Sequence, residues 1–433
     1  MVLPRRGVAG LRPPSERKDG VAFMDLQSAR ELACNLVRPK GAEWVPLDQA
    51  LGRVLAESLT AARDLPGEPR SRMDGYALRS SDAIGLMGDP TVLRLAEGCA
   101  AAGHVVAQPV VAGECLRILT GAPLPPGADA VVPQEAVKLL DGVLAVQHAV
   151  RAGQWVMQPG ADVAAKERVL EAGVVLTPTA LALAAALGNT GLGVHQRPRV
   201  ALLATGDELL ELGETRPGPH YTCNNRYLLG WMTRLQGGLP AHLGVARDDP
   251  AEIEAKLTDT DADLVITTGG IGHGDRDFVP RVWENLGVMV HFRQINLSPG
   301  RYSALGSKGR QIFCALPGNP WAAQVVFSEI VGPMLRRWQG LSIRQIPMLP
   351  ARLASSIRNS SGLYRAIRGA LHNHEGTLVF QPQHSRAVSL FRQVQASQVY
   401  TLIPPNVEEI PSGSAVWVAW FDGPLMALAP WSS

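Results

Sequence analysis

The sequence predicts a multidomain protein that combines α/β and all-β parts, with a central three-layer α/β/α domain on a mostly parallel sheet. Three observations lead to this fold class. The 433 residues correspond to about three domains of ordinary length. Between residues 197 and 345, apolar strand-like runs alternate with helical patterns, which is typical of βαβ units. The flanking stretches contain short strand-like runs broken by Gly and Pro, which favours small β-rich domains.

The N-terminal part predicts a disordered extension followed by a helical stalk. Residues 1–23 carry positive charge but no apolar segment of a signal peptide. Apolar side chains then recur at helical spacing from Met24 to about Leu59, and again in Val174–Leu187. We expect these two helical stretches to pack against each other. The stalk is assigned to residues 24–60 and 155–196, and the β-rich domain inserted into it to residues 61–154.

The central domain, residues 197–345, is the part whose pattern is most regular. After it, from residue 346 to 433, short strand-like runs return and predict a C-terminal β-barrel-like domain. The strand runs of the central domain are Val200–Ala204, Leu239–Val245, Leu264–Thr268, Val288–Gln294 and Ile312–Leu316.

Composition and charge exclude several classes of protein. There are 41 basic and 39 acidic side chains, so the net charge of +2 gives no field for binding nucleic acid. The five cysteines are dispersed without a zinc-binding spacing, which fits a reducing compartment. The longest apolar stretch, near Ala180–Leu187, is far below the roughly 18–20 residues of a membrane span. We expect a cytoplasmic protein with neither nucleic-acid nor membrane partners.

Carboxylates follow three of the predicted parallel strands. Asp207 and Glu208 follow the first strand, Asp248 and Asp249 the second, and Asp275 and Asp277 the third. Parallel strands end at one edge of a sheet, where ligands of open α/β domains bind. Clustered carboxylates repel one another unless a hard cation lies among them, and oxygen ligands of this kind suit Mg²⁺. The sequence therefore predicts a Mg²⁺ site among the carboxylates of these three strand ends, and Mg²⁺ bound there would bridge to substrate phosphates.

Glycines and a helix start at the same edge add candidate anion contacts. Gly269 and Gly270 free the backbone to present N–H groups to a phosphate. Pro317, Gly318 and Asn319 precede a long helix, whose first N–H groups form a natural anion site. An ordinary helix start would have the same residues, so both interpretations stay open. A Walker A motif is absent, and the glycine run lacks the third glycine of the dinucleotide-binding fingerprint.

Six motifs, in their order along the chain, resemble the molybdopterin molybdenumtransferases, the family of bacterial MoeA and the gephyrin E domain. The resemblance extends from about Met24 to the C-terminus. The motifs are Met73-Asp74-Gly75-Tyr76-Ala77, Thr120-Gly121-Ala122-Pro123, Gly160-Ala161-Asp162, Thr205-Gly206-Asp207-Glu208-Leu209, Arg247-Asp248-Asp249-Pro250 and Leu316-Pro317-Gly318-Asn319-Pro320.

The resemblance implies an enzyme of molybdenum cofactor biosynthesis that inserts molybdate into adenylylated molybdopterin and releases AMP, with a divalent cation. It implies an elongated homodimer whose active site combines the central domain of one subunit with the Asp74-bearing domain of the other. Asp74 and Thr120 would be the catalytic contribution of the partner subunit. Glu208, Asp248 and Asp277 would be the catalytic and metal-binding carboxylates. A molybdopterin adenylyltransferase and recipient molybdoenzymes are the expected protein partners.

The same resemblance supplies the cofactor-binding candidates. It places the pterin and the oxyanion against the glycine-rich edge, the loop before the last central strands and the C-terminal domain. The candidates are Asn225, Gly269, Gly270, Ser298, Arg301, Pro317, Gly318, Asn319, Arg368 and Ser385.

One loop departs from the family pattern. Family members usually have Lys-Pro-Gly-Lys-Pro, whereas this chain has Ser298-Pro299-Gly300-Arg301-Tyr302. Arg301 keeps a positive charge, but Ser298 removes one beside the proposed molybdate dianion. Arg368 keeps an oxyanion contact. Arg386 is a candidate replacement for the lost charge, and a solvated surface arginine is the competing interpretation.

Three alternatives to an active insertase stay open. The first is a paralogue that binds molybdopterin or its adenylate without efficient metal insertion, which Ser298 favours. The second is a molybdopterin adenylyltransferase, which shares strand-end motifs but not the flanking β domains. The third is a non-catalytic scaffold of the gephyrin type, for which this chain shows no attached partner domain.

Overall fold

The computed structural model describes residues 15–16, 22–84, 90–104, 108–272, 278–341, 348–383 and 391–421. The chain divides into two compact units, each described here by itself. The first unit comprises Met1–Trp44, Gly52–Ala56 and Gly193–Ser433, and the second comprises Val45–Leu51 and Glu57–Leu192. Among the described residues, no helix is both long and apolar enough to cross a membrane.

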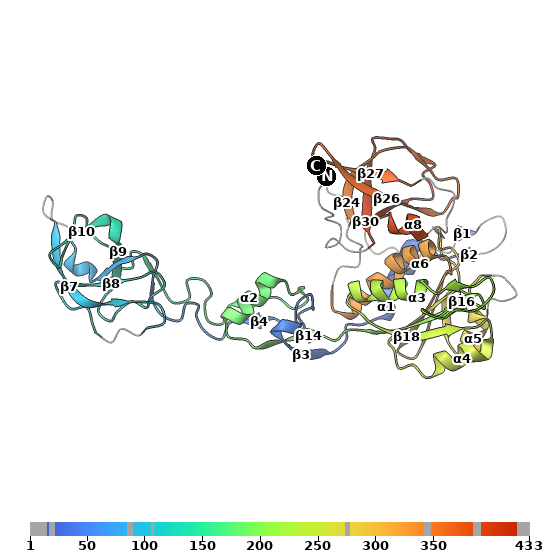
Figure 1. Ribbon diagram of the computed structural model, residues 1–433, viewed down its shortest axis with the longest axis horizontal. Helices are drawn as coiled ribbons and strands as arrows, with labels where there is room; N and C mark the ends of the chain where they lie inside the picture. The colour runs from blue at the N-terminus through green and yellow to red at the C-terminus, as the bar shows by residue number, and fades with distance from the viewer. Residues whose placement is uncertain are drawn as a thin grey trace. The chain divides into compact units, whose positions relative to one another are not determined.

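The first unit is built around a mostly parallel sheet (Figure 1). Along the sheet, β18, β15, β19 and β23 run parallel to one another, whereas β22 is antiparallel to both of its neighbours, β23 and β20. In spatial order the strands are β18 (Leu239–Ala246), β15 (Arg199–Thr205), β19 (Leu264–Thr268), β23 (Gln311–Leu316), β22 (Ala304–Lys308) and β20 (Met289–Phe292).

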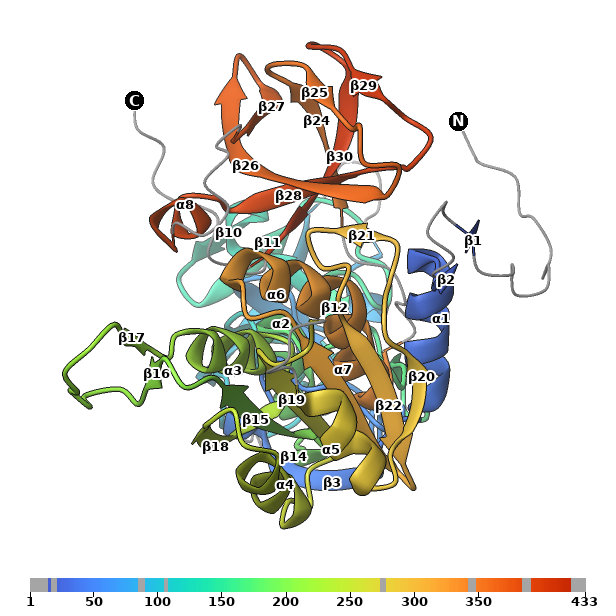
Figure 2. The ribbon, with the colours of Figure 1, turned by 90° about the vertical axis from the view of Figure 1, so that its right-hand side faces the viewer.

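Helices cover both faces of this sheet because its central strands are apolar on both sides. Val200 and Leu202 of β15 belong to a core with α1, α3, α6 and α7, whereas Ala201 and Leu203 pack with α4 and α5. Figure 2 shows α3 and α6 on one side of the sheet and α4 and α5 on the other. The helices are α1 (Leu26–Leu36), α3 (Asn225–Leu235), α4 (Pro250–Thr258), α5 (Val279–Asn285), α6 (Pro320–Val326) and α7 (Gly332–Trp338), with the π-helical segment η4 (Phe327–Val331) between the last two.

The C-terminal part of the first unit closes into a small barrel. Its strands pair in the circular order β26, β27, β24, β30, β28 and back to β26. The short strand β21 (Leu297–Ser298) joins β26 in parallel, so the loop before β22 is attached to the barrel. The other elements are β24 (Met348–Leu353), β25 (Ile357–Arg358), β26 (Tyr364–His374), β27 (Thr377–Pro382), α8 (Phe391–Gln395), β28 (Val399–Ile403), β29 (Glu409–Ile410) and β30 (Ala415–Trp420). The predicted mixture of α/β and all-β parts, with a C-terminal barrel, is confirmed.

The second unit contains a β-rich domain with a core on each face of its main sheet. The sheet order is β10 (Val137–Leu140), β11 (Val143–Val146), β7 (Thr91–Ala100), β8 (Glu114–Ile118), β6 (Gly75–Leu78) and β9 (Ala130–Pro133). The remaining elements of this part of the chain are β3 (Ala42–Pro46), β4 (Leu59–Thr60), β5 (Arg70–Ser71), β12 (Val156–Met157), β13 (Arg168–Leu170), α2 (Pro178–Ala186) and β14 (Gly191–His195).

The structure corrects the prediction of one long N-terminal helix from Met24 to Leu59. The helix α1 begins after its N-cap Asp25 and ends at Leu36, two residues before Arg38-Pro39, and short strands follow it. Proline disfavours helix at the residue before it and breaks the hydrogen-bond ladder, which accounts for the early end. The buried face of α1 packs in the core of the first unit, whereas α2, the second helix predicted for the stalk, belongs to the second unit.

The N-terminal extension is described only in part. Ser15–Glu16 (β1) pairs antiparallel with Ala22–Phe23 (β2), so these residues are ordered as strands rather than disordered. Phe23 is buried, and Met24 continues into a parallel bridge with Ile295. The other residues of the predicted disordered extension lie outside the described ranges.

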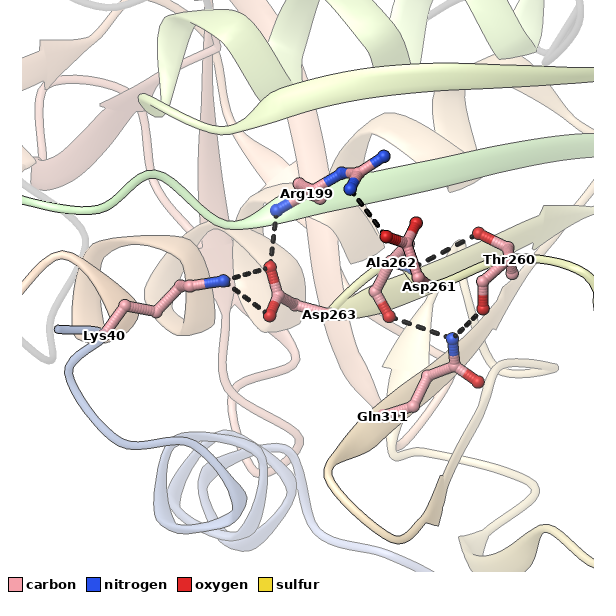
Figure 3. A network of polar contacts seen from close by, with 7 residues as sticks. All are labelled: Lys40, Arg199, Thr260, Asp261, Ala262, Asp263 and Gln311. Carbon is pink, nitrogen blue, oxygen red and sulfur yellow. Dashed lines mark hydrogen bonds and ion pairs between the residues drawn. The ribbon is translucent and has the colours of Figure 1, made fainter.

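A polar network ties the amino ends of the central strands together (Figure 3). Asp263, just before β19, accepts hydrogen bonds from Lys40 Nζ at 2.7 and 2.8 Å and from the backbone N–H of Arg199 at 2.7 Å. Arg199 Nη1 also donates to Asp261 at 2.7 Å. Gln311, at the start of β23, donates to two backbone carbonyls of the turn before β19 at 3.0 and 2.9 Å. These contacts fasten one edge of the sheet and leave the opposite, carboxyl edge for the site.

A buried acid joins α1, η4 and the barrel. Glu329 of η4 accepts a hydrogen bond from the Tyr400 hydroxyl of β28 at 2.5 Å and forms an ion pair with Arg30 of α1. Burial, together with the neighbouring Glu329 carboxylate, holds the pKa of Tyr400 well above its usual range. Tyr400 therefore stays a neutral donor, and the barrel is held against the central domain through it.

We expect Tyr400→Phe to destabilise the first unit. The variant removes a hydrogen bond to a buried charged group, which is worth about 1.5–3 kcal/mol. Thermal and urea unfolding measure the loss, and the exposed Tyr221→Phe serves as the matched control. An unchanged unfolding midpoint for Tyr400→Phe would show that the contact contributes nothing to stability.

Candidate active site

A pocket of about 430 Å³ lies at the carboxyl edge of β15, β18, β19 and β23. It gathers residues from strand ends that are distant in the sequence, as expected for an open parallel sheet. The predicted site residues that line it are Glu208, Asn225, Asp248, Gly269, Gly270, Pro317 and Gly318.

Two glycines form one wall of this pocket because no side chain fits there. Gly269 and Gly270 have φ angles of +96° and +62°. A Cβ on Gly269 would lie 2.5 Å from the Thr205 carbonyl oxygen, and one on Gly270 would lie 2.8 Å from Thr205 Oγ1. The backbone after β19 therefore passes directly against the end of β15, which leaves bare main chain facing the pocket.

Asn225 connects three of the elements that form the pocket. It is the first residue of α3, is buried, and donates from Nδ2 to the Gly318 carbonyl at 2.7 Å and to Thr268 Oγ1 at 3.1 Å. Thr268 in turn donates to the Pro317 carbonyl at 3.0 Å. Within the described ranges, Asn225 Oδ1 is buried and has no hydrogen-bond partner. The Asn225 side chain therefore holds the ends of β19 and β23 together and keeps its Oδ1 as an acceptor for a ligand.

The helix start after β23 serves two purposes. Asn319 Oδ1 accepts from the backbone N–H of Ala322 at 3.1 Å, so Asn319 is the N-cap of α6 and is absent from the lining of the pocket. Pro317 and Gly318 do line the pocket. Asn319 is therefore an ordinary helix N-cap, whereas the two residues before it form part of the pocket wall.

Two of the three predicted metal-binding carboxylates lie in this pocket. Glu208 is exposed on the turn after β15, with its carboxylate over Gly206, and Asp248 is half-buried after β18. Asp277 lies outside the described residues, which stop at 272 and resume at 278. In the described part of the chain, no group of three His, Cys, Asp or Glu side chains is arranged to hold a metal ion.

A second, smaller pocket of about 180 Å³ lies where β21 and the start of α6 meet the barrel strand β26. Ser298 and Arg368 both line it, together with Arg365, Trp321 and Gln383. Arg368 is buried with its guanidinium 5.6 Å from the centre of the Trp321 ring, and burial lowers its pKa. The described lining contains two arginines and no carboxylate, so this pocket suits a small anion.

Arg301 is placed differently from the expectation. Its guanidinium lies 4.3 Å from the ring centre of Phe23 and 5.4 Å from that of Tyr302, and its Nε donates to Gln294 Oε1 at 3.2 Å. Arg301 is absent from the described lining of the pocket that contains Ser298 and Arg368. The aromatic rings, one of them from the N-terminal segment, attract the guanidinium through cation–π contacts. Ser385 and Arg386 lie outside the described residues.

Asp74 and Thr120 are neighbours in the second unit. The backbone N–H and the hydroxyl of Thr120 donate to Asp74 Oδ1 at 2.7 and 2.6 Å. These two hydrogen bonds, aided by the nearby charge of Arg117, lower the pKa of Asp74. Asp74 is thus held as an oriented, exposed carboxylate, and Thr120 is the residue that orients it.

Sequence reasoning missed several residues that line the pockets, among them three with polar side chains. Thr205 and Tyr302 line the larger pocket, and Arg365 lines the smaller one. Thr205 and Tyr302 stood inside the motifs but carried no signal of a ligand contact. Arg365 had no such signal either, since side chains three residues apart on a strand point to opposite faces of the sheet.

The fold and the two pockets define a class: an α/β protein with one pocket at the carboxyl edge of a parallel sheet, where ligands of such sheets usually bind, and a smaller pocket lined by two arginines. A family model described as the MoeA N-terminal region, domains I and II, matches residues 24–188, and one described as a probable molybdopterin binding domain matches residues 201–337. The molybdopterin molybdenumtransferase of Haemophilus influenzae is 30% identical over 401 residues, covering 92% of this chain and 98% of that protein. The chain belongs to the molybdopterin molybdenumtransferase family.

Two further relatives match most of this chain and almost all of their own length. The molybdopterin molybdenumtransferase 2 of Mycobacterium tuberculosis is 33% identical over 405 residues, covering 91% of this chain and 98% of that protein. The crystal structure of a molybdopterin biosynthesis MoeA protein from Pyrococcus horikoshii matches with a TM-score of 0.82 at 27% identity, covering 93% of this chain and all of that one. The chain is therefore a transferase of molybdenum cofactor biosynthesis.

Proposed function

We propose that this enzyme inserts molybdate into adenylylated molybdopterin and releases AMP. The observation that carries the proposal is the 430 Å³ pocket, whose lining combines two carboxylates with a wall of bare glycine backbone. A phosphate-bearing pterin needs both features, because backbone N–H groups bind its anionic oxygens and carboxylates hold the cation that offsets the remaining charge. The family membership supports the same substrate.

The described carboxylates fit a Mg²⁺ ion. Glu208 and Asp248 offer hard oxygen ligands on two neighbouring strand ends, and Asp277 is proposed as the third ligand from outside the described residues. Bound there, Mg²⁺ would offset negative charge on the phosphates that link the pterin to AMP. The chain itself would orient the substrate through the backbone at Gly269 and Gly270 and through the acceptor Oδ1 of Asn225.

The smaller pocket is proposed as the molybdate site. Molybdate is a dianion, and Arg368 offers charged N–H donors in a partly desolvated setting where such hydrogen bonds are strong. Ser298 adds a neutral hydroxyl where the family usually has a lysine. The pterin pocket and the molybdate pocket belong to the same unit and share the loop that runs from Ser298 to Tyr302.

Arg368→Ala is expected to weaken molybdate binding by roughly ten- to a hundredfold, the value of one charge-assisted hydrogen bond of about 1.5–3 kcal/mol. Titration of the purified protein with molybdate measures the change directly, and the molybdate dependence of metal insertion measures it in turnover. Arg352→Gln, an exposed barrel arginine outside the pocket, is the control. Equal molybdate affinity in Arg368→Ala and the parent protein would remove this pocket from the proposal.

A carrier that binds molybdopterin without inserting metal is the second candidate function, and Ser298 is the observation that favours it. The protein supplied with adenylylated molybdopterin, Mg²⁺ and molybdate separates the possibilities. Release of AMP with formation of the cofactor supports the insertase. Tight binding of the pterin without turnover supports the carrier, and adenylylation of molybdopterin by ATP would identify an adenylyltransferase.

The assembly of the protein is proposed from the family resemblance. We propose a homodimer in which Asp74 and Thr120 of one subunit serve the pterin pocket of the other. The molybdopterin adenylyltransferase and recipient molybdoenzymes stay predicted partners, and the cytoplasm stays the predicted compartment.

A further inference from the structure

The loop that departs from the family pattern ends in Tyr302, where family members usually have a proline, and this tyrosine borders two pockets. It lines the 430 Å³ pocket and also a separate pocket of about 110 Å³. Among the described residues, Ile271 and Gly272 are the only others that line both. The two pockets are therefore neighbours, and Tyr302 stands at their boundary.

The 110 Å³ pocket, which we call the side pocket, has the walls of a site for a planar ring. Its described lining contains no carboxylate, and its charged residue, Arg293, is exposed and paired with Glu284 at 2.6 Å. Besides Tyr302 and the three residues already named, the lining consists of Val279, Pro280, Trp283, Val290 and Ala304. Apolar and aromatic walls of this kind are typical of pockets that bind small heterocyclic ligands.

A stack of charged and aromatic side chains supports Tyr302. The Arg301 guanidinium lies 5.4 Å from the centre of the Tyr302 ring and 4.3 Å from the centre of the Phe23 ring. Phe23 is buried and ends β2 (Ala22–Phe23), in the segment before the family resemblance begins. Cation–π attraction to both rings therefore holds Arg301 between the N-terminal segment and Tyr302.

Backbone hydrogen bonds fix the turn that carries Tyr302. The Arg301 carbonyl accepts from the backbone N–H groups of Ile295 at 3.0 Å and Ser303 at 3.2 Å. The buried Ser303 hydroxyl donates to the Gly300 carbonyl at 2.7 Å, and β22 begins directly after it. A side chain on a turn fixed in this way loses little conformational freedom when a ligand binds, which favours affinity.

We propose that Tyr302 is a specificity-determining residue whose ring packs against a planar nitrogen heterocycle of the substrate, with Arg301 and Phe23 as positioning residues. The inference rests on the proposed function and deepens it. Adenylylated molybdopterin carries such a ring at each end, the pterin and the adenine, joined through phosphates. Gly272 lines both pockets two residues after Gly270, so a ring at the boundary stays close to the backbone proposed to bind the phosphates.

Titrations of the pure protein with AMP, molybdopterin and ribose 5-phosphate test the ring contact, because the last ligand has sugar and phosphate but no ring. Tyr302→Leu removes the aromatic face and is expected to weaken binding of AMP or molybdopterin roughly five- to a hundredfold, the range for one base on one aromatic side chain. Its affinity for ribose 5-phosphate should stay that of the parent. Tyr302→Phe, which keeps the ring, should bind all three ligands as the parent does.

The positioning role has its own variants. Phe23→Leu keeps an apolar side chain but removes the aromatic face beneath Arg301, so it should weaken binding of the same ring ligand by a smaller factor. Phe23→Trp keeps an aromatic face and should retain the affinity. Trp417→Leu, which removes an exposed aromatic side chain of the barrel outside both pockets, is the control. The ligand that loses affinity identifies the end of the substrate that Tyr302 contacts.

Each contrary result has a separate meaning. Equal affinities for AMP and for molybdopterin in Tyr302→Leu and the parent would overturn the role of Tyr302 and leave the proposed function intact. An equal loss for all three ligands would also overturn it, since Tyr302 would then shape the pocket without contacting a ring. A lowered unfolding temperature in Phe23→Leu with unchanged affinities would overturn the positioning role of Phe23. A parent protein that binds neither AMP nor molybdopterin would overturn the proposed function itself.

Discussion

Glu208→Gln and Asp248→Asn are each expected to reduce Mg²⁺-dependent release of AMP at least roughly a hundredfold while leaving the fold intact. Each substitution keeps the size of the side chain and removes its negative charge, so a divalent cation loses an anionic ligand. The two side chains lie on turns after β15 and β18, exposed or half-buried, and contribute no core packing. The loss should therefore appear in turnover and not in the unfolding midpoint.

The dependence of turnover on Mg²⁺ concentration distinguishes a residue that binds the cation from a residue with another role. If these carboxylates hold the cation, a higher Mg²⁺ concentration should partly restore turnover in each variant. Asp259→Asn, an exposed acid at the end of α4 outside the pocket, is the matched control and should behave as the parent protein does. Full activity at the usual Mg²⁺ concentration in both pocket variants would remove the reaction from this edge of the sheet.

The central sheet was predictable because its strands are continuous apolar runs that end at Gly, Pro or acidic residues. The run Leu264–Thr268 coincides with β19, and Val200–Ala204 lies within β15 to one residue at each end. Such runs are typical of strands that are buried on both faces of a sheet, and few other structures produce the same pattern. Once these strands are parallel, their carboxyl ends share an edge, so the approximate place of Glu208 and Asp248 followed from the sequence.

The antiparallel strand β22 was missed for a local reason. Its sequence, Ala304–Lys308, is short and contains Gly306, which weakens a strand pattern. The structure needs that glycine, because a Cβ at this position would lie 2.6 Å from Val288 Cγ1. The need for glycine comes from contact with a residue on another segment, so the sequence around Gly306 alone does not reveal it.

The position of Arg301 was unpredictable for a similar reason. The loop resemblance placed its charge beside Ser298, but the guanidinium stacks on Phe23, which lies 278 residues earlier in the chain. Residue types and motifs located the loop, whereas a contact with an aromatic ring distant in the chain determined where its arginine lies.

Mixing two inactive variants is expected to restore part of the activity if the site is completed across a homodimer. Asp74→Ala removes the carboxylate that Thr120 orients, and Glu208→Gln removes a ligand in the first unit. Each homodimer would carry the same defect twice and be inactive. A hybrid dimer would hold one site with both defects and one site with neither, because Asp74 and Glu208 of one site come from different subunits. With free exchange of subunits at equal amounts, half of the dimers are hybrids with one intact site, so about a quarter of the parent activity should return.

The subunit exchange has to be shown independently of activity, by mass spectrometry of differently labelled subunits. Light scattering gives the mass of the assembly. A double variant, Asp74→Ala with Glu208→Gln, mixed with parent protein is the matched control: its hybrids also hold two defects, but each of their sites carries one. That mixture should lose activity as hybrids form, whereas the mixture of single variants should gain it. A monomer in solution, or exchange without any gain of activity, would contradict a site shared between subunits and would confine Asp74 to a role within its own chain.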